Sequence, residues 1–162
     1  MNKIKSAQAL KKILTELKKK GKKIVFTNGC FDILHPGHIR ILRQAKEKGD
    51  VLVVGINSDT SARKIKGSMR PVLDGKARAL NISALECVDY VVLFKNKTPY
   101  TLIRYLRPHY LVKGSDWRHK DIIGNDLVEK VYRVKLMKNY STTSIINKII
   151  ANWKKCTHQK KY

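Results

Sequence analysis

The sequence lacks any apolar run that approaches the roughly 20 residues needed for a membrane-spanning helix. Its first residues, 1–5, are not followed by the long apolar segment that is typical of a secretory signal. Cysteine is rare, with three scattered residues and no CxxC spacing, which favours reduced thiols over a disulfide framework. We therefore expect a cytoplasmic location and no membrane partner.

Acidic residues are also scarce. The 12 aspartates and glutamates face 35 lysines and arginines, which gives a formal net charge of +23. Such a charge suits a polyanionic partner such as nucleic acid or anionic lipid. However, lysine is spread along the whole chain, and the densest runs, residues 18–23 and 154–161, have no interleaved aromatic residues to stack on bases. We therefore expect mostly solvated surface lysines, with nucleic-acid binding as the alternative.

Short apolar segments alternate with amphipathic ones along the 162 residues. Strands are predicted at residues 24–27, 51–56, 88–94, 110–112 and 133–137. Helices are predicted at residues 6–20, 37–48, 59–65, 76–85, 126–132 and 142–153, and from Thr98 onward. This alternation predicts an α/β fold, a Rossmann-like, doubly wound parallel sheet of five strands with helices on both faces.

The length suits a single domain over residues 1–162. We expect its core at about residues 22–150, preceded by the helix of residues 6–20 and followed by a basic tail at residues 154–162. No internal repeat or linker interrupts it. Polar clusters follow the predicted strands, at residues 27–38, 57–59, 113–117 and 140–143. Because ligands bind beyond the carboxyl ends of parallel strands, these clusters are expected to form one site.

Two histidines mark the junction between the first strand and the helix that follows it. His35 and His38 are one helical turn apart, beside a glycine-bearing turn. Free backbone N–H groups and the helix dipole favour an anion at such a junction, so a phosphate is the expected ligand. The pair could instead ligate zinc, but no third ligand stands out, or it could simply cap the helix.

Two segments of the chain resemble the signatures of a known enzyme superfamily. His35, Gly37 and His38 resemble the HxGH signature of the nucleotidyltransferase superfamily. The serine- and threonine-rich residues 140–146 resemble its second signature, at a helix start. Class I aminoacyl-tRNA synthetases share the first signature, but they also need a KMSKS loop. Residues 66–70 evoke that loop only superficially, and the chain is too short for a synthetase.

Further segments resemble one branch of this superfamily, the adenylyltransferase of ADP-heptose synthesis. They are residues 23–59, 66–72, 88–92 and 111–116. The resemblance implies transfer of AMP from ATP to D-glycero-β-D-manno-heptose 1-phosphate for lipopolysaccharide or another surface glycan. Since no sugar-kinase domain is visible, the stand-alone form is expected. The alternatives are a cytidylyltransferase or adenylyltransferase with another acceptor, such as glycerol 3-phosphate or FMN, and a nucleic-acid-binding protein on the same scaffold.

The resemblance also implies the roles of individual residues. The expected catalytic residues are His35, His38 and Lys66. The expected nucleotide contacts are Thr27, Asn28, Gly29, Cys30, Phe31, Gly37, Arg78, Lys113, Gly114, Ser141, Thr142 and Thr143. The expected contacts to the sugar phosphate are Asp32, Asn57, Arg70, Asp116 and Trp117. Mg²⁺ is expected to enter with ATP, without a metal site of the protein's own, and relatives suggest a homodimer.

The chain departs from the family pattern at three places. One is the segment Asp74-Gly75-Lys76, which replaces an acidic stretch before Arg78. Ile146 stands where the superfamily often has arginine or lysine, so a contact to pyrophosphate is lost there. His109 stands where this branch usually has aspartate after proline.

Overall fold

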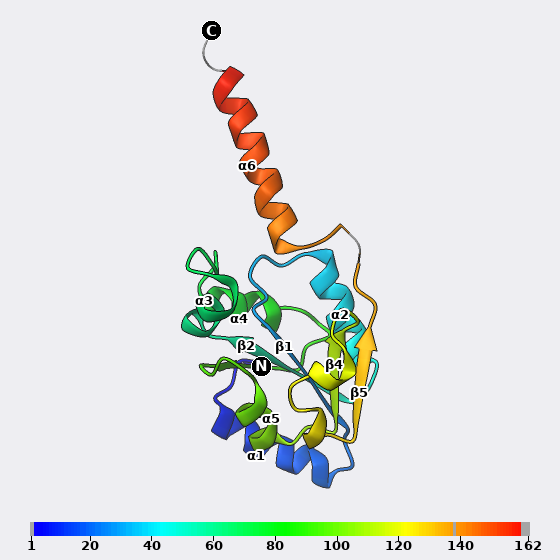
Figure 1. Ribbon diagram of the computed structural model, residues 1–162. Coiled ribbons are helices and arrows are strands. Elements are labelled where there is room, and N and C mark those ends of the chain that lie inside the picture. Colours follow the sequence, from blue (N-terminus) through cyan, green and yellow to red (C-terminus); the bar gives the residue numbers. More distant parts are fainter. Residues whose placement is uncertain (1, 138, 160–162) are drawn as a thin grey trace.

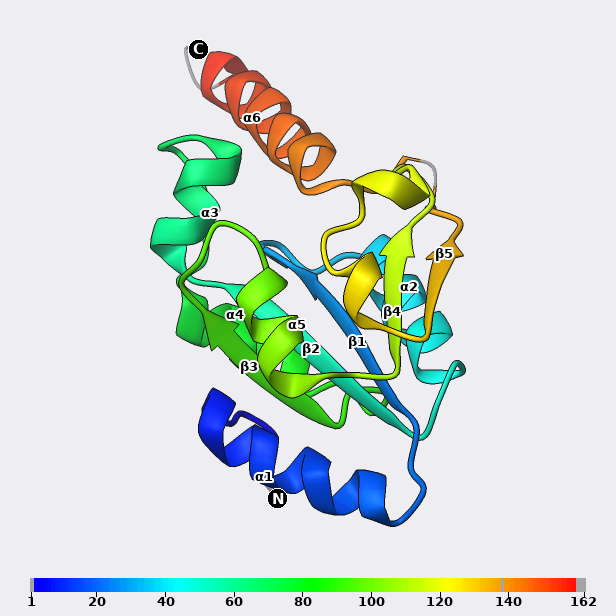
Figure 2. The same cartoon turned by 60° about the horizontal axis from the view of Figure 1, so that its bottom comes forward.

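The structure, a computed structural model, describes residues 2–137 and 139–159. Five parallel strands form one sheet in the order β3-β2-β1-β4-β5 (Figures 1 and 2). The strands are β1 Ile24–Gly29, β2 Val51–Asn57, β3 Tyr90–Phe94, β4 Tyr110–Gly114 and β5 Lys130–Val134. The helices are α1 Ala7–Lys19, α2 Pro36–Lys46, α3 Asp59–Lys66, α4 Gly75–Ser83, α5 Tyr100–Leu106 and α6 Thr142–Gln159. The predicted fold class is confirmed.

Side-chain oxygens cap the starts of several of these helices, among them α1, α3 and α4. Ser6 accepts a hydrogen bond from the Ala9 N–H at the start of α1, and Asp74 accepts one from Ala77 at the start of α4. Ser58 caps α3 in the same way. Each cap satisfies an N–H group that the helix itself leaves free. No helix among the described residues is long and apolar enough to cross a membrane.

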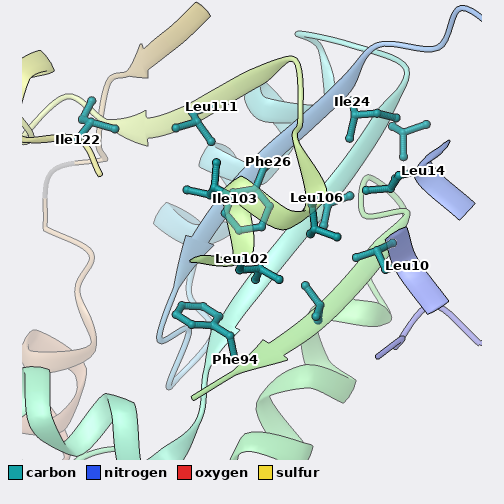
Figure 3. Packing of buried hydrophobic residues seen from close by; sticks show 13 residues of the cluster. Leu10, Leu14, Ile24, Phe26, Phe94, Leu102, Ile103, Leu106, Leu111 and Ile122 are labelled. Atoms are coloured by element: carbon teal, nitrogen blue, oxygen red, sulfur yellow. The ribbon is translucent and has the colours of Figure 1, made fainter. Parts of the chain in front are cut away.

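The sheet buries both of its faces. Helices α1 and α5 cover one face and α2 and α4 cover the other (Figure 2). Successive residues of β1 point to opposite sides, so Ile24 and Phe26 join the core under α1 and α5 (Figure 3), whereas Val25 joins the core under α2 and α4. This double coverage explains why the central strands are continuously apolar in the sequence.

The carboxyl-terminal part of the sheet differs from the prediction. Residues 126–132 were expected to be helical, but only a short 3-10 turn, Asn125–Leu127, precedes β5. The fifth strand therefore starts three residues earlier than the predicted 133–137. It is an edge strand with mixed burial, and Tyr132 packs edge-on against Tyr110 of β4, with ring centroids 5.6 Å apart. Pairing with β4 makes residues 130–134 a strand, and the residues of this segment do not reveal that pairing by themselves.

The last helix also differs from the prediction. It continues to Gln159 instead of ending at Trp153, so residues 154–159 of the predicted basic tail are helical. Residues 160–162 of that tail lie outside the described residues.

The strand order reverses next to β1. The chain adds β2 and β3 on one side of β1 and then places β4 and β5 on the other side. The carboxyl ends of β1 and β4 therefore flank the point where the strand order reverses, which is where open α/β sheets bind ligands.

Candidate active site

A cavity of about 560 Å³ lies at the carboxyl ends of the strands. Its wall is formed by the ends of β1, β2 and β4, the starts of α2 and α6, and the segments around residues 66–70 and 115–123. Every site residue predicted from the sequence, except Arg78, lies on this wall. The carbonyl oxygen of Tyr140 lies 3.6 Å from the position that a Cβ on Gly37 would take. The two signature segments, about a hundred residues apart in the sequence, therefore meet here.

The two histidines are stacked at the N-terminal end of α2. The ring centroids of His35 and His38 are 3.7 Å apart, and the planes are inclined by 22°. A Cβ on Gly37 would come within 3.0 Å of the His35 ring, so glycine is what allows this ring to lie against the backbone. Phe31 meets His38 edge-on, with ring centroids 5.2 Å apart.

Both histidines favour the neutral form. Burial, and after it the neighbouring His35, lowers the pKa of His38 to about 4, although a backbone hydrogen bond with Ile33 opposes the shift. Burial also lowers the pKa of His35. The Nδ1 atoms of both rings are buried and lack a hydrogen-bond partner among the described residues. Unpaired polar atoms at such a depth are costly, so a polar ligand in the cavity would relieve that cost.

The turn after β1 is held from the side by Lys113. The Lys113 Nζ donates to the side-chain oxygen of Asn28 at 2.6 Å and to its carbonyl at 3.3 Å. It also lies 5.8 Å from the centre of the Trp117 ring, close enough for a cation–π contact. Burial lowers the pKa of Lys113 to about 8, against the opposing charge of Asp116. This places an ammonium group of unusually low pKa in the cavity wall.

Asp32 anchors the segment that follows α3, of which Arg70 lies on the cavity wall. Its carboxylate accepts hydrogen bonds from the Arg70 Nε at 2.7 Å, the Val72 N–H at 2.8 Å and the Leu73 N–H at 3.0 Å. Burial alone would raise the pKa of Asp32, but the hydrogen bonds from Leu73, Val72 and Arg70 lower it below its usual value. Asp32 and Arg70, both predicted to contact the sugar phosphate, are thus paired with each other.

Arg78 lies beneath the site and outside the cavity wall. It was predicted to contact the nucleotide, but its side chain is fully buried and does not reach the cavity wall. Its guanidinium donates to the carbonyls of Cys30, Leu73 and Asn57 and pairs with the Asp59 carboxylate at 2.8 Å. Arg78 therefore holds together the turn after β1, the 67–74 segment and the end of β2 through these hydrogen bonds. It is a positioning residue for the cavity wall.

Two predicted contacts have side chains that are already used by the fold. The Thr27 hydroxyl donates to the Val112 carbonyl at 2.9 Å and so links β1 to β4. The Asn57 amide donates to the Ser61 hydroxyl at 2.9 Å. Both residues line the cavity, but these hydrogen bonds hold the cavity floor together.

The start of α6 forms a reciprocal cap. The Ser144 N–H donates to the Ser141 hydroxyl at 3.0 Å, and the Ser141 N–H donates to the Ser144 hydroxyl at 3.1 Å. Ser141, Thr142 and Thr143 all lie on the cavity wall, but the Ser141 hydroxyl is engaged in capping the helix. Such a helix start favours anions.

An apolar part of the wall was not predicted from the sequence. It consists of Ile41, Ile65, Pro99, Ile122, Ile123, Leu136 and Met137. These residues come from five separate segments, and no motif connects them. Their only signal is that several follow β4 and β5. An apolar wall beside a polar floor suits a ligand with a planar or sugar portion as well as phosphate.

Within residues 2–137 and 139–159, no three histidine, cysteine, aspartate or glutamate side chains cluster as a protein-built metal site would require. The carboxylates in the wall are those of Asp32 and Asp116. The Asp32 carboxylate already accepts hydrogen bonds from Arg70, Val72 and Leu73. A hard cation in this cavity would therefore take most of its oxygen ligands from a bound phosphate chain.

Comparison with known protein families gives a match over most of the chain. Residues 26–157 match the family described as cytidylyltransferase-like. The chain is 46% identical over 155 residues to the bifunctional protein HldE of Aliarcobacter butzleri, and 52% identical over 147 residues to that of Campylobacter jejuni subsp. doylei. These alignments cover 96% and 91% of this chain but only 32% and 31% of the relatives. The chain thus spans about a third of the length of the curated relatives that it matches.

Solved structures show the same architecture. The lipopolysaccharide core biosynthesis protein of Thermoplasma volcanium GSS1 superimposes with a TM-score of 0.63 at 30% identity, over 73% of this chain and 100% of that one. A pantoate-beta-alanine ligase from Francisella tularensis, at 18% identity and a TM-score of 0.61, shares the fold over 88% of this chain and 74% of its own.

Proposed function

The chain belongs to the cytidylyltransferase-like family of nucleotidyltransferases, and we propose that it transfers AMP from ATP to D-glycero-β-D-manno-heptose 1-phosphate, which yields ADP-heptose and pyrophosphate. One observation carries the proposal: the stacked imidazoles of His35 and His38 share a cavity with the first turn of α6. The choice of acceptor is supported by the sequence resemblance to the ADP-heptose branch and by the similarity to the HldE proteins.

The reaction requires little covalent chemistry from the protein. An oxygen of the sugar phosphate attacks the α-phosphorus of ATP, the new P–O bond forms, and the bond from the α-phosphorus to the α,β-bridging oxygen breaks. Pyrophosphate leaves with that oxygen. Negative charge shifts toward the leaving group and the equatorial oxygens, so catalysis depends on positioning and on donors that stabilise this charge.

His35 and His38 are the proposed donors to the α-phosphate. Because both pKa values are lowered, the rings are neutral before ATP binds and can donate N–H groups without an existing counter-ion. An approaching triphosphate would raise both pKa values, since an anion stabilises the protonated ring. The hydrogen bonds would then strengthen as charge develops in the transition state.

The β- and γ-phosphates are proposed to lie at the start of α6, on the free N–H groups and hydroxyls of Thr142 and Thr143. Lys113 would place its charge beside the turn of residues 28–31. Lys66, at the end of α3, is exposed and lies on the cavity wall, where it can approach the phosphates from the mouth. Arg70 uses its Nε for Asp32, which leaves the terminal nitrogens of its guanidinium for the acceptor phosphate.

Mg²⁺ would arrive with ATP as part of the substrate. The cavity fits this mode, because a magnesium ion that keeps phosphate and water ligands needs only one or two carboxylates, and Asp116 supplies one at the wall. When bound, the ion neutralises phosphate charge. We also propose that the protein acts in the cytoplasm. From the family resemblance we further propose that it forms a homodimer, and light scattering of the full chain would test the oligomeric state.

The decisive test is a substrate screen. The purified chain is incubated with ATP or CTP and with heptose 1-phosphate, glycerol 3-phosphate or FMN, and pyrophosphate release and product mass are measured. ADP-heptose from the ATP and heptose 1-phosphate pair is the expected product. Exclusive reaction of CTP with glycerol 3-phosphate would refute the proposal in favour of a cytidylyltransferase.

A further inference from the structure

The last helix has a surface that the proposed reaction does not use. Only the first turn of α6 lines the cavity, and the rest of the helix projects away from the body of the protein (Figure 1). From residue 147 to residue 157 every side chain is exposed. A helix of 18 residues in such a position gains little stability from packing against its own chain. The apolar side chains on its surface therefore need another explanation.

One side of α6 is apolar. Ile145, Ile149 and Trp153 follow each other at intervals of four, and Ile146 and Ile150 lie beside them, which places all five on one broad stripe. The distal three are strongly exposed: Ile149 by 59%, Ile150 by 47% and Trp153 by 69%. A contiguous exposed patch of this kind marks an interaction surface.

Lysines flank this apolar stripe, and the helix carries no acidic residue. Lys148 and Lys155 lie on one flank of the apolar stripe and Lys154 lies on the other, while no aspartate or glutamate occurs anywhere in Thr142–Gln159. The whole chain carries +23. An apolar stripe with isoleucine and tryptophan, bordered by lysines on both sides, is the composition of a helix that lies in a membrane interface.

The expectation of no membrane partner rested on the lack of a membrane-spanning segment and of a secretory signal. Neither is needed for binding at a membrane surface, and we propose that the distal part of α6 binds the surface of membranes that contain anionic lipids, with Ile149, Ile150 and Trp153 inserted at the headgroup level. The lysine stems would extend along the apolar side and place their charges among the lipid phosphates. The helix lies on the membrane and does not cross it. A second copy of this chain suits the stripe less well, because it would bring another helix with the same lysines and no carboxylate to pair with them.

The test is co-sedimentation of the full chain with vesicles of phosphatidylcholine mixed with phosphatidylglycerol, and with vesicles of phosphatidylcholine alone. We expect binding to the anionic vesicles only. Because a chain of this charge could adhere by electrostatics alone, the double variant Ile149→Gln/Trp153→Gln is decisive, and we expect it to bind at least tenfold more weakly. The matched control, Met69→Gln/Leu80→Gln, removes two exposed apolar side chains from elsewhere on the surface and should bind as the unmodified chain does.

The charge contribution is tested by Lys154→Gln/Lys155→Gln, which should weaken binding by about fivefold for each lysine. Lys95→Gln/Lys97→Gln removes the same charge at two other exposed positions and should have little effect. Trp153 fluorescence, in a Trp117→Phe background, should shift to shorter wavelengths with anionic vesicles. Equal binding of Ile149→Gln/Trp153→Gln, or no binding at all, would overturn the proposal. A dimer that this variant abolishes, without vesicle binding, would assign the stripe to a second copy.

Discussion

The imidazole rings of His35 and His38 lie face to face with their centroids 3.7 Å apart, so a proton on one ring disfavours a proton on the other. Two neutral rings in this arrangement form a small, rigid pair of N–H donors at the start of α2. The adjoining Gly37 makes the arrangement possible, since a side chain there would collide with the His35 ring.

Removal of either histidine should reduce turnover without unfolding the protein. We expect His35→Ala and His38→Ala each to lower kcat by about 10²-fold or more, because each would remove a donor to the charge that develops in the transition state. Pyrophosphate release measures the effect. His109→Asn is the matched control, since His109 accepts a hydrogen bond from the Ile24 N–H at 2.8 Å outside the cavity. Unchanged rates in both alanine variants would remove the proposed roles, and oligonucleotide binding that survived both would favour the nucleic-acid alternative.

The free energy of unfolding should decrease in acid because of His38. The pKa of this ring is about 4 in the folded protein against 6.5 ordinarily, so between these values the unfolded chain binds more protons. This contribution of His38 to the free energy of unfolding is complete above about pH 6.5 and is lost as the pH falls toward about 4. Its size is on the order of 3 kcal/mol. Urea unfolding across this range measures it. His38→Gln should flatten the dependence, and an identical slope in that variant would contradict the shift.

Replacement of Arg78 should destabilise the protein as a whole. Arg78→Leu leaves the Asp59 carboxylate and three carbonyls without their donor, and we expect a loss of about 3–5 kcal/mol in the free energy of unfolding. Arg63→Leu, at an exposed position of α3, is the control and should cost less than about 0.5 kcal/mol. A loss below about 1 kcal/mol for Arg78→Leu would show that the network contributes little.

Asp32 should control the order of the 67–74 segment. Asp32→Ala removes the acceptor of the Arg70, Val72 and Leu73 hydrogen bonds, so amide exchange at Val72 and Leu73 should accelerate at least tenfold. We also expect a higher KM for the acceptor, since Arg70 loses its fixed position. Asp126→Ala, at an exposed carboxylate bound to Tyr100, should change neither quantity. Unaltered exchange at Val72 and Leu73 would contradict the anchoring role.

Lys113 should make nucleotide binding sensitive to alkaline pH. Its pKa of about 8 means that the ammonium charge is lost above that value, and the affinity for ATP should then fall. Bound phosphate would raise this pKa, so the decline belongs to the free protein. Calorimetric titration with ATP from neutral to alkaline pH measures it. Lys113→Gln should bind ATP more weakly at neutral pH and lack the decline, and a decline that persisted in this variant would assign the titration to another group.

Local patterns in the sequence predicted much of what the structure contains. Alternating apolar and amphipathic segments gave the parallel α/β sheet, because strand and helix periodicities depend on neighbouring residues. The HxGH segment and the serine- and threonine-rich segment predicted the family and the edge of the sheet at which they meet, since the carboxyl ends of parallel strands lie together.

The tertiary structure decided the properties that depend on contacts between distant residues. The burial of Arg78 under the site, the pairing of Asp32 with Arg70 and the strand at Lys130–Val134 each follow from partners far away in the chain. The sequence around a charged residue does not show whether its side chain is buried or exposed. Depth and hydrogen-bond partners are set by packing and desolvation across the whole fold, whereas secondary structure and signature motifs are set by residues that are close in sequence.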